Sequence, residues 1–356
     1  MDSRAKRATL QTIADELGVS RTTISNAYSR PDQLNQALRE RILATARRLG
    51  YPGPDATARS LRRGKAGAIG LVFTETLPYA FADPYSVGFL RGVAEVAETS
   101  GTGLLLIPTP PGAEDPETAV RDAVVDGFCL YCVPLGHPAQ QVIRARGLPI
   151  VMTDETDDPT IPYVGIDERA SARLAAEHLV RLGHRRISVL VDQVVEPGKP
   201  GPATLEEQLA SPCADIRGRL AGYRDAFEEV GIDWAGVPVV AAGRNVRSEA
   251  AQAASPLLDV ADRPTAVLAV SDVLALGVLD ACGQRGLLPG RDISVVGFDD
   301  VPEAERARLT TVRQPMREKG RLVGRLLLEP PGEEKVPRIK LPTELVVRAT
   351  TGPVPR

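Results

Sequence analysis

The sequence predicts two kinds of fold in one chain: a small all-α unit at the N-terminus, then an α/β core of two doubly wound parallel-sheet lobes. Three short amphipathic segments occupy residues 9–50, and apolar runs alternate with amphipathic helices after residue 68. A length of 356 residues exceeds what one ordinary domain needs. With 43% hydrophobic and 25% charged residues, the composition is globular and excludes a disordered or fibrous chain.

The N-terminal segments read as three helices because each begins at a residue that favours an N-cap. Thr9, Ser20 and Asn35 precede runs whose apolar residues recur at spacings of three and four. Gly18 breaks the first helix from the second, and Gly50 ends the third. We therefore predict helices over about 9–17, 21–28 and 35–49.

The core is predicted from alternating elements whose strands are apolar on both faces, a pattern typical of parallel sheets covered by helices on each side. The expected strands are 68–73, 103–108, 127–133, 150–153, 187–191, 237–241, 266–270 and 293–298. The expected helices are 85–100, 119–125, 139–146, 170–182, 217–230, 249–260 and 273–285. This alternation covers more residues than one domain usually holds, so two such units are expected.

The first two helices carry the spacing of a helix-turn-helix. Ala14 is small where two helices must cross, Gly18 supplies the turn, and Ile24 packs the second helix back. In this motif the second helix enters the DNA major groove. The outward-facing candidates for base or phosphate contacts are Arg21, Thr22 and Asn26. A three-helix protein-interaction domain is the alternative reading.

Charge is distributed unevenly along the chain. Residues 1–65 contain 13 Lys and Arg against 6 Asp and Glu, whereas the whole chain has a net charge of −3. A cationic head on an acidic body is the footprint of a nucleic-acid-binding module. A merely soluble, charged head would give the same asymmetry, so charge alone does not decide between them.

The segment between the N-terminal head and the core has the features of a hinge. Asp55–Arg63 follows a Pro-Gly-Pro break, and its Leu61 stands among arginines. A leucine in such a setting can enter the minor groove and kink the duplex. An ordinary linker leucine is the alternative. A segment this short is not helical alone in water, so we expect it to order on DNA.

Polar residues directly follow several predicted strands, where ligands bind in doubly wound sheets. These residues are Thr74, Asp154, Ser271 and Asp299, with Arg219 at the start of a predicted helix. Carboxylates and arginine suit hydrogen bonds to hydroxyls or other small polar groups. For any single one of them, surface ion pairing or helix capping is an equally good explanation.

Taken in order, these motifs resemble the LacI/GalR family of transcriptional regulators over about residues 9–350. The resemblance rests on the stretches Thr9–Ala14, Gly18–Ser20, Thr23–Ser25, Arg39–Ile42, Leu49–Tyr51, Ala58–Leu61, Ile69–Val72, Val164–Asp167, His178–Leu179, Gly183–Ile187, Arg219–Tyr223, Ser271–Asp272, Val295–Asp300, Thr310–Pro315 and Leu341–Arg348. It implies a helix-turn-helix head, a hinge helix and a periplasmic-binding-protein-like core, with a small-molecule effector such as a sugar between the lobes. It also implies a homodimer that binds a pseudo-palindromic site in double-stranded DNA, most often as a repressor.

The resemblance also places domain boundaries and site residues. The head is 1–52, the hinge and linker 53–67, the core 68–350 and the tail 351–356. Lobe 1 is expected at about 68–165 plus 299–320, and lobe 2 at about 166–298 plus 321–350. The implied DNA contacts are Thr9, Leu10, Ser20, Arg21, Thr22, Thr23, Ser25, Asn26, Ala58 and Leu61. The implied effector contacts are Thr74, Asp154, Arg219, Ser271, Asp299 and Gln314.

Two departures from the family bear on the effector. Ser271 stands where members often carry Asn, and many sugar-binding members have an aromatic residue near the sequence position of Asn245, where this sequence has none, so the resemblance does not support stacking on a sugar face. The connection 192–213 is longer than usual and rich in Pro and Gly; it is either a lid or an unrelated surface insertion. Effector identity, and whether the effector is an inducer or a corepressor, stay open.

Other classes of protein lack their signatures. Cys129 and Cys132 form a lone C-x-x-C inside an apolar run, the three histidines show no metal spacing, and no nucleotide-binding or nucleophile-elbow motif occurs. We therefore expect no catalytic site, no cofactor and no metal.

Two other classes of protein share an α/β core. A solute-binding protein would need a secretion signal, and an enzyme would need a cluster of catalytic residues. Without an apolar N-terminal segment, an apolar run long enough for a membrane span, or a disulfide framework, the expected location is the cytoplasm.

Overall fold

The computed structural model describes residues 8–53, 64–113, 115–134, 136–156, 158–194, 198–330 and 336–355. Contacts between residues divide the chain into two compact units, Met1–Ala66 and Gly67–Arg356. Each unit is described separately. The predicted hinge helix, with Ala58 and Leu61, lies outside the described residues.

The first unit holds three helices around a small apolar core. They are α1 (Leu10–Leu17), α2 (Arg21–Ser29) and α3 (Gln36–Arg48), with a 3-10 turn at Pro31–Gln33. The predicted N-caps Thr9, Ser20 and Asn35 each accept a hydrogen bond from a backbone N–H of the first turn. Gly18 ends α1 at φ 65°, a conformation that glycine adopts without a Cβ penalty. The buried core residues are Ile13, Ala14, Ile24, Ala27, Ile42 and Ala46.

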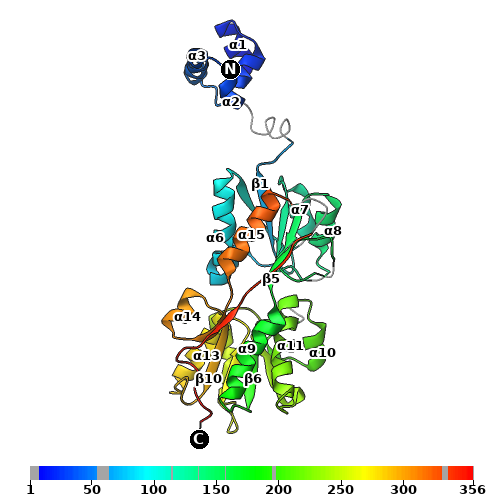
Figure 1. The fold of residues 1–356 in the computed structure, drawn as a ribbon, viewed down its shortest axis with the longest axis vertical. Coiled ribbons are helices and arrows are strands. Elements are labelled where there is room, and N and C mark those ends of the chain that lie inside the picture. Colours follow the sequence, from blue (N-terminus) through cyan, green and yellow to red (C-terminus); the bar gives the residue numbers. More distant parts are fainter. Residues whose placement is uncertain are drawn as a thin grey trace, which may run out of the picture. The chain divides into compact units, whose positions relative to one another are not determined.

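The second unit contains two parallel-dominant sheets, which define two lobes (Figure 1). The first sheet has the order β12-β5-β4-β3-β1-β2, and all its pairs are parallel. Its strands are β1 (Ala68–Phe73), β2 (Gly103–Pro108), β3 (Phe128–Tyr131), β4 (Ile150–Met152), β5 (Tyr163–Ile166) and β12 (Arg338–Leu341). Helices α6 (Pro84–Thr99) and α15 (Met316–Leu328) cover one face, and α7 (Pro116–Asp122) and α8 (Pro138–Ala145) cover the other. A short helix α5 (Leu77–Ala82) precedes α6.

The second sheet has the order β13-β11-β10-β9-β6-β8-β7. Its strands are β6 (Ile187–Val191), β7 (Gly201–Pro202), β8 (Val239–Ala241), β9 (Ala266–Ala269), β10 (Ser294–Asp299), β11 (Thr310–Arg313) and β13 (Glu344–Val346). Only the outermost pairs, β7 with β8 and β11 with β13, are antiparallel among the described residues. The parallel pairing confirms what the doubly apolar strands predict.

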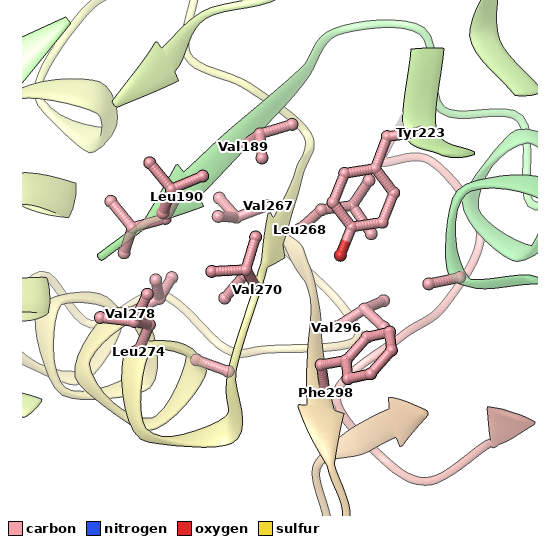
Figure 2. Packing of buried hydrophobic residues seen from close by; sticks show 14 of the residues in the cluster. Val189, Leu190, Tyr223, Val267, Leu268, Val270, Leu274, Val278, Val296 and Phe298 are labelled. Atoms are coloured by element: carbon pink, nitrogen blue, oxygen red, sulfur yellow. The ribbon is translucent and has the colours of Figure 1, made fainter. Parts of the chain in front are cut away.

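Helices enclose the second sheet on both faces. They are α9 (Glu168–Arg181), α10 (Leu205–Ala210), α11 (Ala214–Glu228), α12 (Arg247–Leu258), α13 (Asp272–Gln284) and α14 (Pro302–Arg306). Figure 2 shows this core, in which strand side chains meet Tyr223 of α11 on one side and Leu274 and Val278 of α13 on the other.

The predicted division of the C-terminal segments between the lobes is wrong. Strand β11 continues the parallel ladder of β10, with Val296 opposite Thr310, so residues 299–313 belong to the second lobe. Helix α15 packs instead on α6, and β12 pairs with β5, so Met316–Leu328 and Arg338–Leu341 belong to the first lobe. The chain returns to the second sheet at β13. The stretch Leu341–Arg348 thus begins at the last residue of β12 in the first lobe and contains β13 of the second, with Pro342 between the two strands.

Several element boundaries differ from the predictions by a few residues, and nine helices or strands of the described chain were not predicted separately. Helix α11 begins at Ala214, so Arg219 lies in its second turn rather than at its start. The additional elements include α5, α10, α15 and the edge strand β7. Most are short or lie at sheet edges, where hydrophobic periodicity is weakest.

Candidate functional site

The second helix of the head exposes its N-terminal end. Arg21 and Thr22 are exposed, Ser25 and Asn26 are half-buried, and Ile24 packs into the core. Ser20 Oγ accepts the Thr23 backbone N–H at 3.0 Å, which fixes the start of the helix. The first residues of α2 are thus free to meet a duplex, as a recognition helix requires.

The remaining predicted DNA contacts of the head lie at helix starts. Thr9 forms a reciprocal capping box with Thr12, and Leu10, the first residue of α1, is half-buried. Thr23 is half-buried, and its hydroxyl lies 2.8 Å from Ser20 Oγ. These residues position α1 and α2, and their DNA contacts stay predictions.

A cavity of about 140 Å³ lies in the core unit between the two lobes. Five of the six predicted effector residues line it: Thr74, Asp154, Arg219, Ser271 and Asp299. The first two follow strands of the first sheet, whereas the other three come from elements of the second lobe. The structure therefore brings together residues from both lobes, as expected for the carboxyl ends of parallel strands. Gln314 is the exception, since it does not line the cavity.

A larger cavity, of about 1250 Å³, lies elsewhere, beside α12 and the edge of the second sheet. Its lining is mostly apolar, and it contains none of the predicted site residues. The smaller cavity is the candidate site because charged groups of both lobes converge there.

Arg219 makes two hydrogen bonds and a cation–π contact within the site. Its Nε donates to Glu168 Oε2 at 2.8 Å, one Nη donates to the carbonyl oxygen of Val270, and the guanidinium lies 3.9 Å from the Phe298 ring centre. The side chain is only 9% exposed. Burial alone would lower the pKa of Arg219, but the surrounding acids, Glu168 first among them, raise it well above its usual range. The cation is thus permanent, and it retains N–H donors for a ligand.

Gln314 acts on the site through Asp299. Its Nε2 donates to Asp299 Oδ1 at 2.5 Å, and its Oε1 accepts from the Tyr85 hydroxyl at 3.2 Å. Asp299 has φ 122°, a left-handed conformation that strains a residue with a Cβ. The amide therefore links an acid of the second lobe to an aromatic residue of the first.

A second polar connection crosses between the lobes through Asn245. Ser271 Oγ donates to Asn245 Oδ1 at 2.6 Å, and Asn245 Nδ2 donates to the Tyr79 hydroxyl at 3.0 Å. Tyr79 lies on α5 of the first lobe, whereas Asn245 follows β8 of the second. Ser271 also caps α13, because it accepts the Leu274 N–H at 3.2 Å. The predicted effector residue Ser271 is thus part of an interlobe contact.

Lys319 is a site residue that sequence reasoning missed. It is 3% exposed on α15, with Nζ 3.3 Å from the Tyr85 hydroxyl. Burial would lower the pKa of Lys319, but Tyr85, Cys132, Asp154 and Glu168 raise it above its usual range. One signal was available: Lys319, Val323 and Leu327 recur every four residues, which places the lysine on the apolar stripe.

Further acids line the cavity beyond those predicted. Glu75, Asp83, Glu168, Asp192 and Asp215 join Asp154 and Asp299. Burial raises the pKa of Asp154 to about 7 and that of Asp192 to about 7. Asp192 directly follows β6, so the rule that found Asp154 would have found it too. Asp192 was instead counted as the first residue of the long connection 192–213, so its position at a strand end was not considered.

The described residues give no support for a metal site or a membrane span. Among them no group of three or more His, Cys, Asp or Glu could hold a metal ion, and no helix is long and apolar enough to cross a membrane. Cys129 and Cys132 are both free, and burial raises the pKa of each thiol. Such thiols are poor nucleophiles and poor metal ligands.

Comparison with known proteins gives consistent matches. The family of periplasmic binding protein-like domains matches residues 176–351. An HTH-type transcriptional regulator of Mycolicibacterium smegmatis is 44% identical over 98% of this chain and 97% of its own. The lac repressor dimer bound to operator and the anti-inducer ONPF is 27% identical, with TM-score 0.78 over 97% of this chain and 99% of that chain. The transcriptional regulator CelR in complex with cellobiose is 28% identical, with TM-score 0.69 over 97% and 100%.

A helix-turn-helix head joined to a two-lobed, periplasmic-binding-protein-like core defines a class of DNA-binding transcriptional regulators. Within that class, the chain belongs to the LacI/GalR family.

Proposed function

We propose that the protein is a sequence-specific repressor whose affinity for its operator is set by a small molecule bound between the lobes. The observation that carries this proposal is the cavity lined by Thr74 and Asp154 of one lobe and Arg219, Ser271 and Asp299 of the other. A ligand that touches both sides binds one lobe arrangement better than another, and this differential affinity is what allosteric control requires.

Two relatives support the proposal. One was solved as a dimer with operator and an anti-inducer, and the other with cellobiose. By analogy, this chain would form a homodimer on a pseudo-palindromic operator and take a sugar or related metabolite. The proposed DNA contacts are those of α1 and α2, with Arg21, Thr22 and Asn26 nearest the bases.

The test is a mobility-shift titration of the full-length protein on DNA from upstream of its own gene, against random duplex at near-cellular salt. We expect affinity for a specific site to exceed that for random duplex by at least about a thousandfold. Sugars, nucleosides and purines are then added in turn, and we expect one of them to shift operator affinity by roughly 5–150-fold. Equal binding to all duplexes would refute the proposal.

A further inference from the structure

The connection 192–213 contributes the ends of its chain to the cavity wall. Asp192, Gln193 and Cys213 line the cavity, and Asp215 follows in the first turn of α11. The middle of the connection lies at the sheet edge instead, where β7 pairs with β8. There, Gln208 Oε1 of α10 accepts the Trp234 Nε1–H at 2.9 Å. The described part of this connection is therefore fixed to the second lobe. It places one acid, Asp192, at its start and another, Asp215, just after its end, and both line the cavity.

Acidic side chains outnumber basic ones around the cavity, and burial raises the pKa of Asp154 and of Asp192 to about 7. Among the described residues, the carboxylates in its lining are Glu75, Asp83, Asp154, Glu168, Asp192, Asp215 and Asp299, whereas the cations are Arg219 and Lys319. Arg219 is engaged by Glu168 and by the Val270 carbonyl, and Lys319 lies against the Tyr85 hydroxyl. An anionic ligand would add negative charge to this crowded, desolvated cluster of acids, whereas an uncharged ligand would not.

In two of these side chains, one carboxyl oxygen has no hydrogen-bond donor in the part of the chain that the structure describes. Asp154 Oδ2 and Asp192 Oδ1 are shielded from solvent and have no partner among the described residues. They come from opposite lobes, Asp154 after β4 and Asp192 after β6. A buried acceptor without a donor is costly, more so when it is charged, so both oxygens favour a ligand that brings donors.

From this arrangement we infer that Asp192, together with Asp154 on the facing lobe, selects an effector that donates hydrogen bonds to both lobes and carries no negative charge. The inference rests on the proposed function and narrows it. Hydroxyl and ammonium groups both supply such donors. The cavity of about 140 Å³ favours a compact molecule, because pockets for drug-sized ligands measure roughly 300–1,000 Å³. A phosphorylated or carboxylated sugar should bind more weakly than its uncharged counterpart, because it brings negative charge to the same acids.

The test compares ligands that share a carbon skeleton and differ in charge. Binding to the full-length protein is measured by calorimetry, and operator release by mobility shift. The neutral probes are glucose, galactose and ribose, and the amine probes are glucosamine and galactosamine. The anionic probes are glucose 6-phosphate, ribose 5-phosphate, glucuronate and galacturonate. We expect neutral or amine members to bind at least about tenfold more tightly than their anionic counterparts. Comparing glucose with glucosamine separates hydroxyl from ammonium recognition.

Asp192→Asn tests the named residue, because it keeps the side-chain size and removes the charge. We expect affinity for the preferred probe to fall about tenfold and discrimination against its anionic counterpart to shrink by a similar factor. Asp262→Asn is the matched control: Asp262 is 85% exposed, pairs with Arg186 at 3.2 Å and lies outside this cavity, so it should change neither value.

The outcomes separate this inference from the proposed function. Wild-type binding of an anionic probe as tight as that of its neutral counterpart overturns the inference and leaves effector control intact. Unchanged discrimination in a folded Asp192→Asn protein overturns it as well. If no probe of any charge alters operator affinity, effector control and this inference fail together. The wild-type comparison needs no variant, so it holds even if Asp192→Asn does not fold.

Discussion

At the scale of single residues, the site combines structural and candidate binding roles in the same side chains. Arg219 ties α11 to Glu168 of α9 and to the end of β9, while its remaining donors face the cavity. Arginine suits this double role because its planar fork offers five donors at fixed angles and stays charged. A substitution there must disturb both folding and ligand response.

Replacing Arg219 with methionine should lower the unfolding free energy of the core by about 3–5 kcal/mol, because the buried ion pair is broken and the half-buried Glu168 carboxylate loses its partner. Adding Glu168→Gln should recover part of that loss, since it removes the unpaired charge. Urea unfolding of both variants measures this. Operator binding should survive in each, and the effector response should be absent. An effector response equal to wild type would remove Arg219 from the site.

The raised carboxyl pKa values give a pH dependence with a definite sign. The folded pKa of Asp192 is about 7, chiefly because of burial, and Asp215 adds to it while backbone N–H groups and Arg219 oppose it. An unfolded aspartate titrates near pH 4. Between these values the folded protein holds more protons, so this group's contribution to stability falls as pH rises from about 4 to 7.

Asp192→Asn should therefore reduce the loss of stability that the ligand-free protein shows between pH 5 and pH 8, by at most about 3 kcal/mol. Asp154 and Asp272, whose pKa values burial also raises to about 7, keep part of the slope. Urea unfolding at a series of pH values measures the difference between the two proteins. Parallel pH profiles for wild type and variant would show that Asp192 titrates normally.

At the scale of elements, glycines let helix pairs approach closely. Gly92 of α6 faces α15, and a Cβ there would overlap the backbone carbonyl oxygen of Arg317. Gly320 on α15 meets the carbonyl oxygen of Phe89 in the same way. This close crossing fixes α15 to the first lobe, and α15 carries Lys319 into the cavity.

Gly92→Ala should destabilise the first lobe by about 1–3 kcal/mol or more, because the added methyl forces two backbones apart. Gly283→Ala is the matched control in α13, where nothing lies within 4 Å of the new Cβ. That variant should be neutral or stabilising by up to about 1 kcal/mol through helix propensity. Thermal unfolding compares the two; equal effects would mean that the α6–α15 crossing can relax.

Helix α2 yields the prediction for sequence readout. Arg21→Ala should cost about 1–3 kcal/mol at particular operator base pairs and little elsewhere, because an arginine fork reads a guanine edge. Binding to a set of operators with single base changes, measured at fixed salt, tests this. Equal weakening on every sequence, with a smaller salt slope, would assign Arg21 to a phosphate instead.

The sequence predicts an element well where its apolar residues follow a clear helical or strand pattern, and poorly where that pattern is weak. Caps and spacing located α1, α2 and α3, and the long apolar runs located the central strands within a few residues. Partners of the outer elements were not predictable, because the assignment of α15 and β11 to lobes depends on tertiary packing. The same limit applies to the site: strand ends gave Asp154 and Ser271, but Lys319 and Asn245 reach the cavity only through the folding of distant segments.

At the scale of the whole core unit, two hydrogen-bonded bridges between described residues join the lobes beside the cavity. Tyr79 accepts from Asn245 at 3.0 Å, and Gln314 connects Tyr85 with Asp299. These bridges favour the arrangement in which the acids of both lobes face each other. Because a typical hydrogen bond contributes only about 0.5–1.5 kcal/mol, each bridge biases the lobes without locking them. A bias of this size leaves the equilibrium between the closed and open lobe arrangements within reach of the binding energy of a ligand.

Tyr79→Phe removes one bridge and should shift the lobes toward an open arrangement. We expect effector affinity to fall about 2–10-fold, because the ligand must then supply the lost closing energy. Small-angle X-ray scattering of the ligand-free variant should show a larger radius of gyration, and effector binding should restore the wild-type value.

Tyr223→Phe is the control: the Tyr223 hydroxyl lies inside the second lobe with no partner among the described residues, so neither the effector affinity nor the radius of gyration should change. If Tyr79→Phe instead matched wild type in both measurements, closure would rest on the ligand and the Gln314 bridge, and Asn245 would be left as an anchor for Ser271.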